Sequence, residues 1–283
     1  MTIAVTGATG QLGRLIVEDL IARGVAPDQV VATGRSTERL ADLAEQGVRT
    51  VAASYEDVAS LTAAFEGVDT LVLVSGSEVG QRVAQHANAI EAAKAAGVGH
   101  VVYTSAPHAD TTALVLAPEH KATEELLRGS GLAWTIVRNN WYTENYAQTV
   151  AQARETGVIL TSTGEGRVAS ASRADYAAGA AAVAVGDGHE GRVYELTGDV
   201  AWTFDEFAAA VSQALGTPVV HQAVSPAEHA EILSGVGLDA GTVGFVVALD
   251  EGIARGDLAD ATTDLRTLIG RPTTPIAETL RTL

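Results

Sequence analysis

Hydrophobic positions change from strand-like to helix-like spacing within the first twenty residues of the chain. Ile3–Val5 is a short, continuous apolar run, which is typical of a buried strand. The apolar residues that follow have the spacing of an amphipathic helix, at Leu12, Leu15, Ile16 and Leu20. The chain therefore begins as a strand that leads directly into a helix.

The same alternation continues as far as residue 137. Further strands are predicted over Val30–Thr33, Thr50–Ala53, Thr70–Val74, His100–Thr104 and Trp134–Val137. The intervening helices are predicted over Thr37–Gln46, from the S-x-x-D signal at Ser54–Asp57, over Gln81–Ala96 and over Glu119–Ser130. Six alternations of strand and helix predict an α/β fold with a doubly wound parallel sheet of the Rossmann type.

From about Asn139 the alternation becomes less regular. Short strands are predicted around glycine turns, over Val158–Leu160, Val168–Ala169 and Val193–Leu196. An alanine-rich helix over Ala174–Val185 is suited to close packing on the sheet, and Asp175 is expected to cap it. Two capping boxes, Thr203–Glu206 and Ser225–Glu228, predict the starts of later helices.

These patterns divide the chain into two parts. Residues 1–145 form the predicted nucleotide-binding Rossmann domain, and residues 146–283 form a smaller mixed C-terminal lobe with strands and a helix that return to the main domain. A cleft between the two parts is expected to hold the substrate.

Composition excludes several classes of function for this chain of 283 residues. Its formal charge of −17 disfavours nucleic acid and anionic membranes as partners. The absence of cysteine excludes disulfides, thiol catalysis and thiolate-bound metals, and the seven histidines lack metal-binding spacing. No leader or apolar span is recognisable, so a cytoplasmic protein is predicted, with a homo-oligomer left open.

The first turn carries the strongest functional signal. Gly7, Gly10 and Gly13 form a G-x-x-G-x-x-G pattern between the first strand and the first helix. In dinucleotide-binding proteins such glycines make the turn, admit the pyrophosphate and bring helix and strand together, and the helix N-terminus faces the phosphates. Dinucleotide binding is therefore predicted, with a purely structural turn as the alternative.

The end of the second strand indicates which dinucleotide is bound. NAD-selective proteins place an acidic residue there, whereas this chain has Arg35 followed by Arg39. A guanidinium can bind the 2′-phosphate of NADPH, although both arginines could also be solvated residues at a helix start. Ser54 and Tyr55 are positioned to flank the adenine, with a surface role for the tyrosine equally possible.

Candidate substrate residues follow the later strands, because ligands bind at the carboxyl ends of parallel strands. They are Ser75–Ser77, Thr104–Ser105 and the run Arg138–Tyr146, which combines amides with aromatic rings. His120 precedes the sixth strand and could be structural or catalytic, and His108 has a similar status. A structural loop is the alternative interpretation of the aromatic run.

A missing motif restricts the chemistry. No tyrosine is followed four residues later by lysine, and the chain has only Lys94 and Lys121. The Tyr-x-x-x-Lys acid of alcohol dehydrogenases and sugar epimerases is therefore absent. A quinone needs no such acid, because hydride addition yields a hydroquinone anion whose charge spreads into the ring, and solvent can protonate it.

Several segments together resemble the NmrA-like atypical short-chain dehydrogenases, and within them the NAD(P)H:quinone oxidoreductase type 2 group. The resemblance covers nearly the whole chain and is carried by Thr6–Gly13, Ser77–Arg82, Tyr103–Asp110, Arg138–Tyr146, Ser170–Ala178, Gly188–Asp199 and Ala201–Thr203. The sequences RN-x-WYTENY and GHEG-x-VYEL are the most specific of these. The resemblance implies NADPH in the cleft and reduction of quinones.

The resemblance also implies a set of site residues. Cofactor contacts are expected from Gly7, Ala8, Thr9, Gly10, Gln11, Leu12, Arg35, Ser54, Tyr55, Ser75, Gly76, Ser77, Asn139, Asn140, Trp141, Tyr142, Thr143, Glu144 and Arg173. The catalytic set is expected to be His120, Asn140 and Tyr142, with His120 where the wider family has a catalytic lysine. The chain departs from the family at Ser54, where an acidic residue is usual, and at Asn140, where glycine is usual.

A function of a different class also fits the sequence. Some NmrA-like proteins act as redox sensors that bind a dinucleotide without turnover and control a protein partner. The missing Tyr-x-x-x-Lys motif suits either function, whereas the run of amides and aromatic rings favours an enzyme. The sequence therefore predicts an NADPH-dependent quinone reductase, with the non-catalytic sensor as the alternative.

Overall fold

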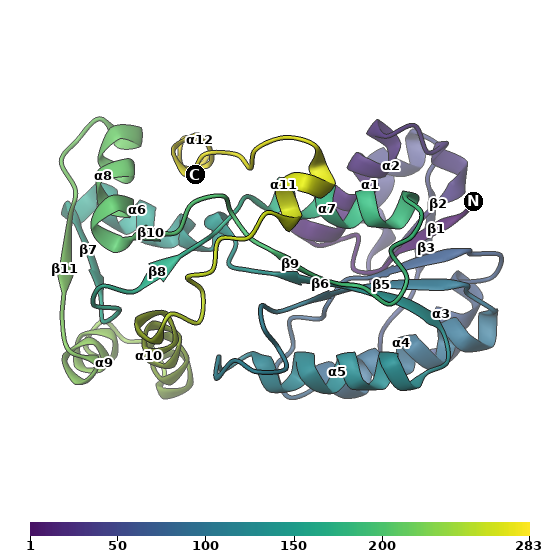
Figure 1. The fold of residues 1–283 in the computed structure, drawn as a ribbon, viewed down its shortest axis with the longest axis horizontal. Helices are drawn as coiled ribbons and strands as arrows, with labels where there is room; N and C mark the ends of the chain where they lie inside the picture. Colours follow the sequence, from purple (N-terminus) through teal and green to yellow (C-terminus); the bar gives the residue numbers. More distant parts are fainter.

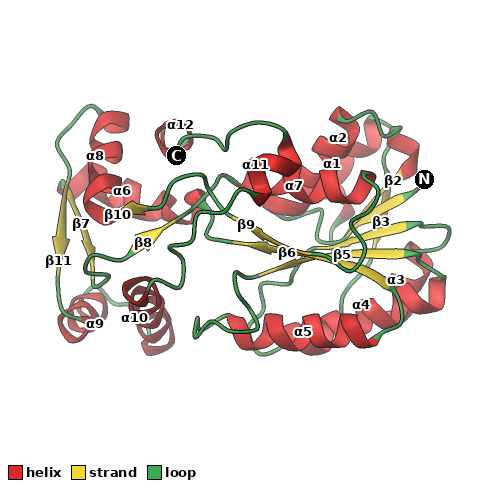
Figure 2. Ribbon diagram, in the orientation of Figure 1, coloured by secondary structure: helices red, strands yellow, loops and turns green.

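The computed structural model describes residues 1–283 as two unequal parts (Figure 1). The larger part is a parallel sheet of seven strands in the order β3-β2-β1-β4-β5-β6-β9. The smaller part holds two short sheets, β10–β8 and β11–β7, among helices (Figure 2). The predicted doubly wound Rossmann sheet and the smaller mixed lobe are confirmed.

The elements have the following bounds. The strands are β1 (Ile3–Val5), β2 (Val30–Gly34), β3 (Arg49–Ala52), β4 (Thr70–Leu73), β5 (His100–Ser105), β6 (Ala133–Asn139), β7 (Val158–Thr161), β8 (Arg167–Val168), β9 (Val193–Leu196), β10 (Trp202–Thr203) and β11 (Val220–Ala223). The helices are α1 (Gln11–Ala22), α2 (Ala41–Glu45), α3 (Val58–Ala64), α4 (Arg82–Ala96), α5 (Ala117–Gly129), α6 (Ala147–Thr156), α7 (Arg173–Val185), α8 (Phe204–Leu215), α9 (Pro226–Gly235), α10 (Ala240–Arg255), α11 (Asp264–Ile269) and α12 (Ile276–Leu280).

Alternate residues of each central strand point to opposite faces of the sheet, so the sheet has a hydrophobic core on both sides. Ile3 and Val5 of β1 pack with α1 and α7, whereas Ala4 between them packs with α3 and α4. Figure 1 shows α1, α2, α7 and α11 over one face and α3, α4 and α5 over the other. Because both faces are covered, the central strands β1, β2 and β4 consist mainly of apolar residues.

Part of the C-terminal half returns to the main sheet, as the sequence indicated. Strand β9 pairs in parallel with β6, and α7 packs beside α1. A Cβ on Gly179 would lie 2.9 Å from Leu265 of α11 and 3.2 Å from Leu196 of β9, so the glycine lets these two leucines pack closely on α7. These contacts link the lobe to the nucleotide-binding part.

The lobe has its own aromatic core. Trp202 and Phe207 stack with ring centroids 4.9 Å apart, and Tyr146 lies against both. The capping box at Thr203–Glu206 is confirmed, whereas at Ser225 only the serine hydroxyl accepts its bond, from the backbone N–H of Glu228. No helix of the chain combines the length and the apolar character needed to cross a bilayer.

Some local predictions were wrong in detail. Helix α3 is capped by Asp57, whose carboxylate accepts two backbone N–H groups, and not by Ser54. Helix α7 is capped by Ser172, because the carboxylate of Asp175 is fully buried and turned toward the backbone N–H of Thr274. The predicted helix over Thr37–Gln46 begins as a 3₁₀ turn, and β6 extends two residues beyond its predicted end.

Candidate active site

A cavity of about 680 Å³ opens at the carboxyl ends of the parallel strands. Most of the predicted site residues line it together: Gly7, Thr9, Gly10, Gln11, Leu12, Arg35, Ser54, Tyr55, Ser75, Gly76, Ser77, His120, Asn139, Asn140, Trp141, Tyr142 and Arg173. This volume lies in the range of sites for cofactors and other small ligands. The structure thus brings seventeen residues from distant segments to one place.

The glycine turn forms one end of this cavity. Gly7 has φ +61°, a backbone conformation that favours glycine, and a Cβ on Gly13 would overlap the Gly7 carbonyl. Helix α1 starts after Gly10 without a side-chain cap and without an acidic residue in its first turn. Its free N–H groups and positive dipole end therefore suit the anionic pyrophosphate of a dinucleotide.

Arg35 and Tyr55 lie near this end in different environments. The side chain of Arg35 is 76% exposed and its guanidinium lies 3.1 Å from the Glu78 carboxylate, so it can move to a phosphate. The Tyr55 hydroxyl lies 2.7 Å from the Thr6 hydroxyl and also donates to the Val74 carbonyl. Tyr55 is therefore an internal support of the cavity wall and not a free surface aromatic.

A buried histidine holds the loop after β4. His86 is fully buried, and its Nε2 accepts the backbone N–H of Gly76 over 2.9 Å. Its Nδ1 lies 2.9 Å from the Thr123 hydroxyl, which donates to the Glu119 carbonyl. Because burial lowers the pKa of His86 to about 3, the ring is neutral, with its proton on Nδ1.

This histidine and His120 give a testable pH dependence of stability. Both have a pKa lowered to about 3 in the folded protein against 6.5 as the ordinary value, so the unfolded chain binds more protons as the pH falls below 6.5. As the pH falls from 6 to 5, each of these two histidines should lower the free energy of unfolding by about 1 kcal/mol. Denaturant unfolding at several pH values should show His86→Gln losing less stability over this interval than the wild type. An equal pH slope in both proteins would mean that His86 is not held neutral.

Two buried ionic groups complete the wall beside this loop, and the sequence analysis did not single them out. The guanidinium of Arg82 donates to the Gly76 carbonyl and lies 2.6 Å from Glu119, whose other oxygen accepts the Gly80 N–H. The motif Ser77–Arg82 marked this segment, yet the pairing with α5 could not be read from it. The pair ties the loop after β4 to helix α5.

His120 projects from α5 into the cavity wall and is only 6% exposed. Its Nδ1 lies 2.8 Å from the hydroxyl of Tyr103, a fully buried residue of β5. Burial, together with the nearby positive charge of Arg82, lowers the pKa of His120 to about 3. The ring is therefore neutral at physiological pH.

The two amides at the end of β6, Asn139 and Asn140, have different environments. Asn139 donates from Nδ2 to the Tyr142 hydroxyl, and its buried Oδ1 has no partner in the protein. A buried acceptor without a donor costs about 1–3 kcal/mol, which a bound ligand can recover. The amide of Asn140 is instead engaged with the backbone, because its Nδ2 donates to the Leu258 carbonyl and its Oδ1 accepts the Trp141 N–H.

Three predicted cofactor residues do not line the cavity. Ala8 is fully buried under the glycine turn. Thr143 pairs its hydroxyl with Ser170 over 2.9 Å, and the carboxylate of Glu144 accepts the backbone N–H of Arg173 at the start of α7. In this structure these side chains support the cavity wall without facing its interior.

The far end of the cavity is apolar, and sequence reasoning did not find most of it. Trp141 packs there against the hydrophobic cluster of the lobe that includes Leu114 and Leu258, and Pro107 and Leu116 from the β5–α5 connection also line the cavity. In the sequence these residues are marked only by their position, either after a strand or in an irregular segment, and that position does not indicate a role in binding. This end is suited to an apolar, flat ring.

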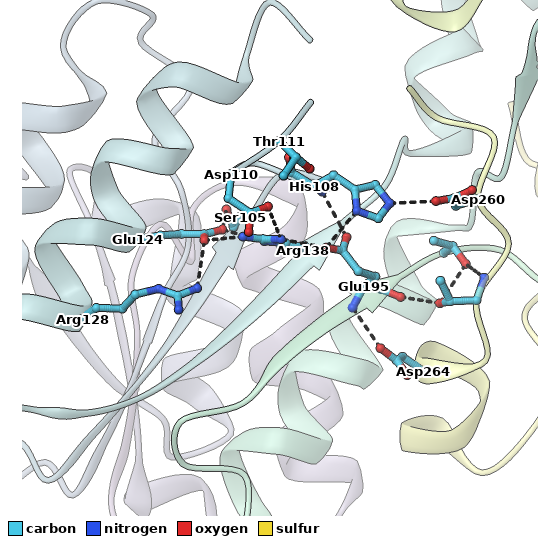
Figure 3. A network of polar contacts seen from close by, with 12 residues as sticks. Ser105, His108, Asp110, Thr111, Glu124, Arg128, Arg138, Glu195, Asp260 and Asp264 are labelled. Atoms are coloured by element: carbon cyan, nitrogen blue, oxygen red, sulfur yellow. Dashed lines mark hydrogen bonds and ion pairs between the residues drawn. The ribbon is translucent and has the colours of Figure 1, made fainter. Parts of the chain in front are cut away.

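A cluster of charges around the buried Arg138 and Glu124 anchors the β5–α5 connection (Figure 3). Arg138 of β6 lies 2.7 Å from Glu124, 2.8 Å from Asp110 and 2.9 Å from Glu195. Next to it, His108 contacts Glu195 and Asp260, with φ +46° in its own backbone. These contacts join α5, β6 and β9 behind the apolar end of the cavity.

Comparisons with known proteins agree with this geometry. A family model described as NAD(P)H-binding matches residues 7–185. Quinone oxidoreductase 2 of Escherichia coli (strain K12) is 48% identical over 278 residues, which cover 98% of this chain and 97% of that protein. The crystal structure of an NADPH-dependent quinone oxidoreductase from Escherichia coli, complexed with NADPH, matches with a TM-score of 0.94, 48% identity and coverage of 99% and 98% of the two chains. The triphenylmethane reductase of Citrobacter sp., complexed with NADP(H), matches at 37% identity and TM-score 0.93, with 99% of each chain covered.

Proposed function

This chain belongs to the NAD(P)H-binding family, and from that premise we propose that it is an NADPH-dependent quinone reductase. The observation that carries the proposal is one cavity with a dinucleotide-binding glycine turn at one end and an apolar end at the other. Similarity to the quinone oxidoreductase of Escherichia coli over nearly the whole length of both chains supports it. That the protein acts in the cytoplasm and without nucleic acid stays a prediction, and whether it forms a homo-oligomer stays open.

The residues fit NADPH. The turn Gly7–Leu12 would hold the pyrophosphate through backbone N–H groups, and the mobile guanidinium of Arg35 would bind the 2′-phosphate. The unpartnered Oδ1 of Asn139 would accept an N–H or hydroxyl from the nicotinamide end. When bound, the reduced nicotinamide supplies a hydride to the substrate.

The chain's own contribution is to position the substrate and exclude water. Trp141, Leu114 and Leu258 would hold the quinone ring, and Tyr142 is fixed by an edge contact with Tyr176 at a centroid distance of 5.2 Å. The guanidinium of Arg173 lies over the Tyr142 ring, 5.2 Å from its centroid. We assign a contact role at the reacting ring to Tyr142 and His120, and a wall-forming role to Asn140.

Cofactor preference gives a direct prediction. Arg35→Asp should weaken NADPH much more than NADH, because it removes a bidentate phosphate contact and adds a repulsive charge, together costing about 2–4 kcal/mol. Titration of both cofactors measures the difference. Arg39→Asp is the matched control, since Arg39 is exposed and does not line the cavity. Equal weakening of both cofactors in Arg35→Asp would show that Arg35 does not bind the phosphate.

The reaction itself is tested by NADPH oxidation with and without benzoquinones and naphthoquinones. Quinone-dependent oxidation with formation of hydroquinone is the expected result. The alternative function is the redox sensor, which would bind NADPH tightly without oxidising it at any quinone concentration. That outcome would overturn the proposed function while leaving the cofactor site intact.

A further inference from the structure

His120 is held from behind by a residue that never touches the cavity. We propose that Tyr103 fixes His120 as a neutral hydrogen-bond donor whose Nε2–H points to the quinone oxygen, an inference that rests on the proposed function. Tyr103 is fully buried in β5 and does not line the cavity, whereas His120 does. Tyr103 is thus a positioning residue, and His120 is the group that would touch the substrate.

The direction of the Tyr103–His120 hydrogen bond follows from the surrounding polar groups. The proton of Thr123 is used on the Glu119 carbonyl, and its hydroxyl oxygen receives Nδ1–H from His86. The hydroxyl of Tyr103 forms its hydrogen bond with Nδ1 of His120, 2.8 Å away. If Nδ1 carried the proton, the only other acceptor near the buried phenol would be the Thr123 oxygen, which already receives Nδ1–H from His86, so the phenol proton would lack a strong acceptor. Tyr103 therefore donates to Nδ1, and the imidazole proton lies on Nε2.

The opposite edge of the imidazole ring faces the ligand. Nε2 of His120 has no hydrogen-bond partner in the protein. It is also not fully enclosed by protein atoms, and because His120 lines the cavity, Nε2 is accessible from there. The charged and titratable groups around the ring are Arg82 and His86 on α4, Glu119 on α5 and Tyr103 on β5. Arg82 is paired with Glu119, and the buried ring stays uncharged.

If His120 is a neutral N–H donor, it does not transfer a proton to the quinone during the reaction. Hydride from NADPH adds to the quinone, which gains two electrons and becomes the hydroquinone monoanion, while the cofactor becomes NADP⁺. Nε2–H stabilises the negative oxygen by a hydrogen bond and keeps its proton, in the manner of an oxyanion-hole donor. Water then supplies the one proton that completes the hydroquinone. The rate of hydride transfer should not follow the titration of His120.

The tautomer can be measured without turnover. The protein carrying ¹⁵N-labelled histidine and bound NADP⁺ is examined by NMR, and His120→Gln identifies the resonances of this ring. Nε2–H alone is expected in the wild type, and a mixture of both tautomers in Tyr103→Phe. Tyr194→Phe is the matched control. The Tyr194 hydroxyl lies 2.8 Å from Nδ1 of His189, and neither residue lines the cavity. An Nδ1–H tautomer of His120 in the wild type would overturn the proposal.

Kinetics separate positioning from simple structural support. Tyr103→Phe should lower kcat by about 5- to 20-fold with an unchanged Kd for NADPH, and His120→Gln, which keeps an N–H donor, should retain more activity than His120→Ala. In the His120→Gln background, Tyr103→Phe should change kcat by less than about twofold. Wild-type kcat should be flat between about pH 5 and pH 9. An equal loss from Tyr103→Phe in both backgrounds would contradict the proposal. No quinone turnover in the wild type would instead refute the proposed function, and the NMR result still reports the tautomer.

Discussion

The substitution Gly10→Val is expected to abolish NADPH binding while the protein remains folded. Gly10 has φ −91° and ψ 172°, which any residue adopts, so the backbone is not strained by a side chain. A Cβ there would lie 3.2 Å from the Gly7 carbonyl, and the branched methyl groups would occupy the cavity before the first turn of α1. Since the pyrophosphate needs that space, we expect Kd to rise at least about a thousandfold, or about 4 kcal/mol. Calorimetric titration with NADPH measures the loss.

A matched valine tests whether the effect is local. Gly129 is exposed near the end of α5, and a Cβ there would meet no atom within 4 Å, so Gly129→Val should bind NADPH normally. Gly10→Ala should fall between the wild type and Gly10→Val. Circular dichroism and Tm check that each variant is folded. A folded Gly10→Val with retained affinity would remove this turn from the cofactor site.

The turn around Gly10 was predictable because its signal is local. Strand β1, the glycines and the apolar face of α1 lie within twenty consecutive residues, and each constrains the next through backbone geometry. The same holds for the cap at Thr203, whose partner is three residues away. The clustering of Tyr55 and Tyr142 also followed, because residues after parallel strands meet at one edge of the sheet, whereas the place of His120 on α5 was implied by the family resemblance.

Contacts between distant segments were not predictable in this way. Asp175 has a sequence suited to a helix cap, yet it binds the backbone of Thr274, ninety-nine residues further on. The pairing of His86 with Gly76 and of Tyr103 with His120 depends on how α4 and α5 pack on the sheet. Single side chains carry no sequence signal for such partners, since many polar residues lie at comparable positions. The roles of these residues became visible only in three dimensions.

The ion cluster at Arg138 is the clearest case, and it leads to the largest expected loss of stability. Arg138 looked like part of a ligand-binding run, but its guanidinium is only 5% exposed and faces away from the cavity lining toward three carboxylates. Glu124 is 3% exposed, and Arg138 is its buried partner at 2.7 Å, whereas Arg128, which is 41% exposed, lies 3.4 Å from it. Removing one partner of a buried ion pair leaves an uncompensated charge, which costs about 3–5 kcal/mol.

Arg138→Met, which keeps the length of the side chain, should therefore lower the free energy of unfolding by about 3–5 kcal/mol. Denaturant unfolding measures this loss. Arg167→Met is the control, because its pair with Glu206 is about half exposed on both sides and should be worth less than about 1 kcal/mol. Adding Glu124→Gln to Arg138→Met removes the stranded charge, so the double variant should regain more than about 1 kcal/mol. If Arg138→Met costs no more than Arg167→Met, the cluster does not stabilise the β5–α5 connection, and the apolar end of the cavity must be held by packing alone.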